Sequence, residues 1–152
     1  MTWEVALAEL EGLAGRELGV SSWVSVTQQR IDAFADATGD HQWMHVDMPR
    51  ATRERGGTIA HGLLILSLLP SLSDELMRVT GYSHGFSYGY DRLRFTNQVR
   101  AGTRIRLRQT VSSVEPRKAG LLVRVSCVVE LENDVRPALI AEHLSIYYGR
   151  AT

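Results

Sequence analysis

The sequence lacks the features that would place this chain outside a reducing aqueous compartment. Cys127 is its single cysteine, so the chain cannot form an intramolecular disulfide. Its longest apolar run, Leu63 to Leu69, contains Ser67 and stops at Pro70, well short of the ~20 residues that a membrane-spanning helix needs. The first residues also lack the basic-then-apolar pattern of a secretory signal. We therefore expect a cytoplasmic protein without a membrane segment.

An excess of charge of one sign is absent as well. The 17 Lys and Arg residues balance the 17 Asp and Glu residues. This balance gives no electrostatic reason to expect a nucleic-acid or membrane-surface partner, so a small-molecule partner is expected instead. The 152 residues contain no repeat, low-complexity tract or linker. We expect one domain over residues 1–152, long enough to bury roughly 70% of the surface of its unfolded chain.

The first third of the chain predicts short helices and one strand. Thr27 offers a hydroxyl as N-cap, and Gly39 follows that segment where a helix commonly ends in the left-handed conformation. Pro49 suits the first turn of a later helix, which Gly56 and Gly57 would end. Apolar periodicity predicts helices over residues 3–14, 28–38 and 48–54, and alternation predicts a strand over residues 22–26.

The segment from His61 to Leu69 is apolar nearly all round, which is typical of a helix wrapped by other elements. Pro70 would kink or end this central helix. Beyond the bend, apolar residues can continue a helical stripe; they are Leu72, Leu76, Met77 and Val79.

From Gly85 onward the apolar pattern has a period of two. In the expected strand Thr103–Val114, arginines alternate with Ile105 and Leu107. This alternation indicates a sheet with one solvent-exposed face and one packed face. We expect an antiparallel meander, its packed face covered by the central helix, and hence an α+β fold: a curved sheet wrapped around one long helix. The expected strands are Ser22–Val26, Phe86–Phe95, Thr103–Val114, Leu121–Leu131 and Ala138–Tyr148.

The stretch between Gly39 and Leu66 carries the chemistry. Asp40 and His45 lie five positions apart, and in a loop they can converge on a single water that the carboxylate deprotonates and the imidazole orients. At the start of the central helix, the amide of Gly62 lacks an intrahelical partner, and the absent side chain lets a carbonyl oxygen approach. Such a donor stabilises an emerging enolate. The combination predicts hydration of a double bond conjugated to a thioester, or the reverse dehydration.

Two stretches, FADATGDHQWMHVD and GGTIAHGLL, resemble the MaoC-like (R)-specific enoyl-CoA hydratases, also called hydratase 2, and YGYDRLRF and VRAG follow in the same order. The resemblance implies a hot-dog fold, in which Asp40 and His45 act on one water and the amide of Gly62 binds the thioester carbonyl. It implies a coenzyme A or acyl-carrier-protein thioester as substrate and no further cofactor. It also implies a homodimer with the pocket at the subunit interface.

The chain departs from the family motif at two positions. Gln42 and Trp43 stand where the common motif has Asn and Pro, a variation similar to the NodN-like branch. We expect both residues to contact the substrate and to affect the choice of acyl chain. His61 is expected to bond to a neighbouring loop through its imidazole. The alternative is contact with the ligand, and for this reason His61 is counted among the candidate substrate-binding residues.

Other interpretations of the same residues stay open. A metal site could draw on acidic and imidazole side chains, but their spacing matches no closed zinc pattern, so no metal is expected. The arginines of two predicted strands could meet the phosphates of the substrate's arm or could form a solvated face. The residues concerned are Asp40, His41, His45, Asp47 and His61 for a metal, and Arg92, Arg94, Arg104, Arg106 and Arg108 for phosphates. A thioesterase and a non-catalytic acyl-thioester-binding dimer are the alternative functions.

Overall fold

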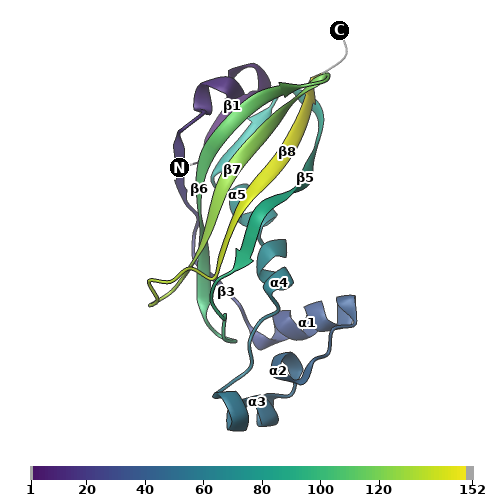
Figure 1. The fold of residues 1–152 in the computed structure, drawn as a ribbon, viewed down its shortest axis with the longest axis vertical. Helices are drawn as coiled ribbons and strands as arrows, with labels where there is room; N and C mark the ends of the chain where they lie inside the picture. The colour runs from purple at the N-terminus through teal and green to yellow at the C-terminus, as the bar shows by residue number, and fades with distance from the viewer. Residues whose placement is uncertain (1, 150–152) are drawn as a thin grey trace.

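The computed structural model describes residues 2–149, and its main feature is a six-stranded antiparallel sheet that curves around two short helices (Figure 1). The strand order is β2-β6-β7-β8-β5, and β3 pairs with another part of β6. The strands are β2 (Glu17–Val20), β3 (Val24–Ser25), β5 (Tyr82–Phe95), β6 (Arg104–Arg117), β7 (Gly120–Leu131) and β8 (Leu139–Gly149). The strand expected over residues 22–26 is therefore shorter, and β2 was not predicted.

The predicted meander is right for three strands and wrong for the fourth. Strands β6, β7 and β8 follow one another across the sheet, as expected. Strand β5 pairs with β8, at the far edge, with Phe86 opposite Ile146. The connection from Phe95 to Arg104 is longer than a tight hairpin turn and carries the chain from one side of the sheet to the other.

The two faces of the sheet differ as the alternation in β6 predicts. Ile105 and Leu107 are fully buried in the core. Arg106 and Arg108 point to the other face, where both bond to Glu130. Leu107 lies opposite Val129 in the register of β6 and β7, so apolar pairs extend across the inner face.

Helices α1 (Gln28–Thr38) and α3 (Met48–Arg55) confirm two predictions and their end signals. The hydroxyl of Thr27 accepts a hydrogen bond of 3.2 Å from the Arg30 amide, and Gly39 ends α1 with a φ of 76°. Gly56 ends α3 with a φ of 75°. A one-turn helix, α2 (Trp43–Val46), lies between them and was not predicted. All three helices lie beyond one end of the sheet (Figure 1).

The predicted central helix is two helices. Helix α4 (Gly62–Ser67) ends at Leu68, and α5 (Leu69–Ser73) starts with Pro70 in its first turn, where the missing amide donor costs nothing. Their inward-facing side chains are buried, but Leu63 is 57% exposed, so the prediction of apolar wrapping all round is wrong for this residue. The buried residues are Leu64, Ile65, Leu69 and Leu72.

Two helical predictions fail because distant segments pair. Residues 3–14 form β1 (Trp3–Ala6) and a 3-10 helix, η1 (Leu7–Leu13). Of the stripe expected after Pro70, Leu72 is helical, in α5, but Met77 and Val79 lie in β4 (Met77–Thr80). Strands β1 and β4 pair in parallel, with Val5 opposite Val79. Both valines are buried in the core that the helices and the main sheet share. Within the described residues, no helix has the length and apolar character to cross a membrane.

Candidate active site

Asp40 and His45 converge in the structure, as their spacing predicts. Asp40 lies in the loop after α1, whereas His45 lies in α2 and not in a loop. Together with His61, just before α4, each offers one potential ligand atom, and these atoms all lie within 4.8 Å of one another. Three segments therefore bring one carboxylate and two imidazoles to one point.

The His45 side chain is buried and held in one orientation. Its Nδ1 donates a hydrogen bond of 2.6 Å to the carbonyl oxygen of Ile59, which leaves Nε2 as the free nitrogen. The side chain of Gln28 donates to the carbonyl oxygen of His45 at 2.8 Å and accepts a hydrogen bond from Thr58. Because the backbone and the ring are both fixed, His45 can present a lone pair on Nε2.

Asp40 combines an anchored backbone with an exposed carboxylate. Its carbonyl oxygen accepts a hydrogen bond of 2.9 Å from Nε2 of His61. Its Oδ2 lies 4.0 Å from the same nitrogen, and its side chain is 57% exposed. An exposed carboxylate beside a buried imidazole can accept a proton from a water that both groups contact.

His61 makes the bond to a neighbouring loop that the sequence predicts. The ring is 4% exposed and stacks on His45, with centroids 3.8 Å apart and planes 25° from parallel. Phe34 of α1 packs on it at 5.0 Å between centroids. The Nδ1 atom of His61 is buried and has no hydrogen-bond partner among residues 2–149.

Gly62 borders the cavity that contains these groups. The cavity has a volume of about 370 Å³, and an adjoining cavity of about 260 Å³ also reaches His45, Gly62 and Phe95. A Cβ atom at Gly62 would lie 2.8 Å from the Phe95 ring. A side chain at this position would therefore require the Phe95 ring to move. The first cavity is lined by Phe34, Thr38, Asp40, His45, His61, Gly62, Leu63 and Phe95.

The two motif departures, Gln42 and Trp43, are not among the residues that line either cavity. Gln42 is the N-cap residue of α2 and makes no capping bond with its side chain. The guanidinium of Arg50 lies over the ring of Trp43, with 4.1 Å between Cζ of Arg50 and the ring centroid. Their expected contact with substrate therefore stays a prediction.

Of the five possible metal ligands, the structure gathers Asp40, His45 and His61. His41 instead pairs with Asp36 at 2.8 Å, and Asp47 caps α3. The gathered groups are close enough to hold a cation, but Nδ1 of His45 and Nε2 of His61 already donate to carbonyl oxygens. A metal on Nε2 of His61 would have to displace the bond to Asp40, whereas a water needs no such change.

Most of the arginines proposed for phosphate binding are engaged with carboxylates on the outer face of the sheet. Arg104 pairs with Glu132, and Arg106 and Arg108 both pair with Glu130. Burial acts to raise the pKa of Glu130, but the hydrogen bonds from the two arginines outweigh it and lower that pKa. These arginines form an ion-pair ladder. Arg92 lies 4.0 Å from Glu142, but its side chain is 83% exposed.

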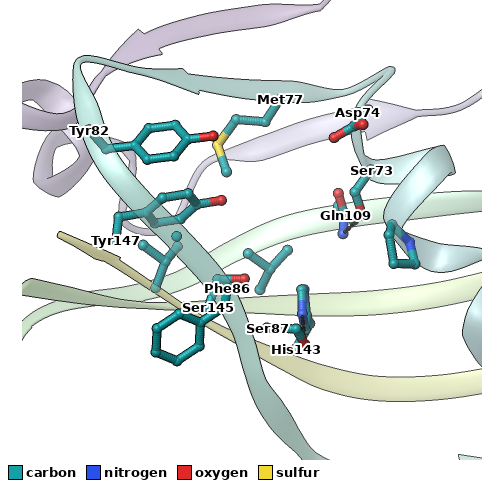
Figure 2. A pocket seen from close by; sticks show the side chains of 14 residues that line it. Ser73, Asp74, Met77, Tyr82, Phe86, Ser87, Gln109, His143, Ser145 and Tyr147 are labelled. Carbon is teal, nitrogen blue, oxygen red and sulfur yellow. Dashed lines mark hydrogen bonds between the residues drawn. The ribbon is translucent and has the colours of Figure 1, made fainter.

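A further cavity, of about 300 Å³, lies beside the end of α5, under β5 (Figure 2). Tyr82 and Tyr147 border one side of it (Figure 2), and Ser87 on another side bonds to Nε2 of His143 at 2.8 Å. Burial lowers the pKa of His143. Gln109, only 3% exposed, also lines it. This cavity shares no lining residue with the one at Asp40, and no sequence motif indicated it.

Four residues around Asp40 and His45 were not predicted. The side chain of Gln28 bonds to the backbone of His45, and the backbone of Ile59 bonds to the His45 ring. Phe34 and Phe95 form walls of the cavity. Ile59 acts through its carbonyl oxygen, which every residue type possesses, so no sequence signal marks it. Gln28 directly follows the N-cap of α1, and only the fold shows that it meets α2.

Comparisons with known proteins show the family of the chain. The model of the MaoC like domain matches residues 9–133. The chain is 45% identical to nodulation protein N of Rhizobium leguminosarum bv. viciae over 147 residues, covering 94% of this chain and 91% of that protein. It is 41% identical over 144 residues to 3-hydroxyacyl-thioester dehydratase Z of Mycobacterium tuberculosis, covering 93% and 95%.

A solved structure supports the architecture. The unliganded R-hydratase PhaJ1 from Pseudomonas aeruginosa superposes with a TM-score of 0.73 over 90% of this chain and 83% of that chain, at 21% identity. The curved sheet around α4 and α5 is thus the hot-dog fold that the sequence predicts. The chain belongs to the MaoC-like dehydratase domain family.

Proposed function

We propose that this protein is a hydro-lyase that adds water to a trans-2-enoyl thioester to give the (R)-3-hydroxyacyl thioester, or runs the reverse dehydration. The observation that carries the proposal is the convergence of Asp40 and His45 in a cavity that Gly62 also lines. Membership of the MaoC-like family and the relative named 3-hydroxyacyl-thioester dehydratase Z support it.

In the proposed reaction, one water lies between the carboxylate of Asp40 and Nε2 of His45. Asp40 takes a proton from the water as the water oxygen bonds to C3 of the substrate. The electron pair of the double bond moves through C2 to the thioester oxygen, where the amide of Gly62 stabilises the enolate. The enolate then collapses as C2 takes up the proton held by the Asp40 and His45 pair. No oxidation state changes overall, so the reaction needs no cofactor beyond the thioester substrate itself.

The orientation of His45 suits this role. Because Nδ1 donates to Ile59, the neutral ring has its lone pair on Nε2 and can accept the second hydrogen of the water. We propose a coenzyme A or acyl-carrier-protein thioester as the substrate, as the family resemblance implies. Arg92 and Arg94, both exposed, are the arginines of the predicted set that lie outside the ion-pair ladder on β6.

The test is the hydration of crotonyl-CoA, followed by the loss of absorbance of the conjugated thioester. Asp40→Asn and His45→Gln should each lower the rate by about 10²–10⁴-fold, the usual contribution of a general acid or base. Asp36→Asn and His41→Gln are matched controls, because this exposed pair lies in the same region but outside the cavity. If Asp40→Asn or His45→Gln turned over substrate about as fast as the controls, the assignment would be rejected.

A thiol-reactive dye added to the same assay separates the alternative functions. Hydration releases no thiol, whereas a thioesterase would release free coenzyme A from each substrate molecule. Binding of acyl-CoA with neither reaction would indicate a non-catalytic acyl-thioester-binding protein.

We also propose a homodimer, formed through the edge strand β5. Its outer backbone groups have no strand partner among the described residues, and an edge of this kind is a template for pairing with another chain. Phe86, Tyr88 and Phe95 on this strand are about half exposed. Phe95 also borders the cavity at Gly62, so a partner seated on β5 would close that side of the active site.

A further inference from the structure

His61 contacts both members of the proposed catalytic pair at the same time. It donates a hydrogen bond to the backbone of Asp40 through Nε2, and its ring stacks on that of His45. Phe34 packs on it as well, so the ring is held from more than one side. A displacement of this one side chain would therefore move the carboxylate and the imidazole relative to each other.

The bond from His61 is the shortest hydrogen bond that Asp40 makes within residues 2–149. The Asp40 amide donates to the hydroxyl of Thr38 at 3.4 Å, and Oδ1 accepts from the amide of Gln42 at 3.4 Å. Both are long and local in sequence, whereas His61 is 21 residues away and its bond measures 2.9 Å. His61 thus ties the Asp40 loop to the start of α4.

The hydrogen bonds assign opposite tautomers to the two stacked rings. A carbonyl oxygen can only accept, so His45 carries its proton on Nδ1 and His61 carries its proton on Nε2. The lone pair of His61 is then on Nδ1, which is buried without a partner among the described residues. An unpaired buried acceptor opposes folding, so stability alone does not account for an imidazole here.

We propose that His61 is a positioning residue, locked as the Nε2–H tautomer, which holds Asp40 over His45 so that both face one water. The kinetic part of this inference rests on the proposed hydratase function. The tautomer assignment does not.

The first test uses 15N NMR of the imidazoles of the full-length protein at neutral pH. Two-bond 1H–15N correlations should show His45 with a protonated Nδ1 and His61 with a protonated Nε2, each assigned by the loss of its signals in a His→Gln variant. A protonated Nδ1 on His61, or rapid exchange between its tautomers, would overturn the inference. This result is independent of whether the protein hydrates any thioester.

The second test compares three variants of His61. The amide nitrogen of His61→Gln can reach the place of Nε2, that of His61→Asn is too short, and His61→Phe keeps the stacked ring without a donor. The Asn and Phe variants should lose about 10²-fold in kcat, the cost typical of a misplacement near 1 Å, with little change in KM. His61→Gln should recover most of the rate.

Melting temperatures and binding of a saturated acyl-CoA show whether each variant remains folded with an intact pocket. Equal kcat in the Phe variant and the native protein, a Gln variant no better than the Phe variant, or a change in KM alone would each refute the positioning role. Where a variant does not fold, the NMR measurement on the native protein decides.

Discussion

At the scale of single residues, Gly62 is the position where the lack of a side chain matters most. It lines the same cavity as His45, and the Phe95 ring occupies the space where a Cβ would lie. The helix that begins here has only six residues, so its dipole adds little and the amide itself is the relevant donor.

We predict that Gly62→Ala lowers the rate of hydration by about 10²–10³-fold, the range found when an oxyanion donor is lost. The added methyl group must displace the Phe95 ring or block the approach of the thioester oxygen. Crotonyl-CoA kinetics measure the effect. Gly12→Ala serves as control, because a Cβ at Gly12 meets no atom within 4 Å. A Gly62 variant as active as this control would contradict the assigned role.

From the sequence, candidate site residues could be chosen where the residue type is itself diagnostic. A carboxylate, an imidazole and a glycine at a helix start each supply a chemistry that few residue types can supply, and the structure brings Asp40, His45 and Gly62 to one cavity. Ile59 and Phe95 were not predictable in this way. Their contribution is a carbonyl oxygen and a ring surface, and both depend on contacts between segments far apart in the sequence.

At the scale of elements, local periodicity predicted those helices and strands that local signals determine. Helix α1 has a capping threonine and a terminal glycine, and the structure places its ends there. Strands β1 and β4 carry apolar spacing that also suits a helix, and their pairing with each other decides their conformation. Pairing across more than seventy residues cannot be inferred from a window of sequence.

His143 lies in β8, opposite Tyr90 of β5, and burial disfavours the charged form of its ring. Because burial lowers the pKa of His143 in the folded protein, the folded state binds a proton less readily than the unfolded chain does. The neutral ring contributes stability above the unfolded-state pKa, near 6.5. This contribution is lost as pH falls below 6.5 and through the lower pKa of the folded state.

We therefore predict that the melting temperature of the native protein falls more steeply below pH 6.5 than that of His143→Gln. Glutamine keeps a polar group beside Ser87 but cannot be protonated in this range. Thermal melts between pH 7.5 and 4.5 measure the difference, and His84→Gln, at an exposed position on β5, is the control. Parallel curves for the native protein and His143→Gln would contradict the prediction.

At the scale of the whole molecule, the edge of the sheet connects assembly with chemistry. The N-terminal half of β5 borders the cavity at α5, and Phe95 at its other end borders the cavity at Gly62. A second copy that pairs along this strand would lie next to both cavities. In the monomer alone, Phe86, Tyr88 and Phe95 of β5 stay about half exposed.

We predict that Phe86→Glu weakens the proposed dimer, because it places a charge on the exposed apolar edge. Sedimentation velocity at several protein concentrations measures the dissociation constant, which should rise by at least tenfold, or about 1.4 kcal/mol. The hydration rate should fall in parallel at low protein concentration. Val135→Glu, at a fully exposed position outside β5, should change neither quantity. A monomeric native protein with full activity would refute the proposed assembly.

The single thiol of the chain has a practical consequence for all of these measurements. Cys127 is 1% exposed within β7, and burial raises the pKa of its thiol, so little reactive thiolate forms while the protein stays folded. The folded chain should therefore not react with maleimides or with disulfide-based thiol dyes. A cysteine introduced at a chosen surface position would then accept a fluorophore or spin label selectively, and the native background would need no removal.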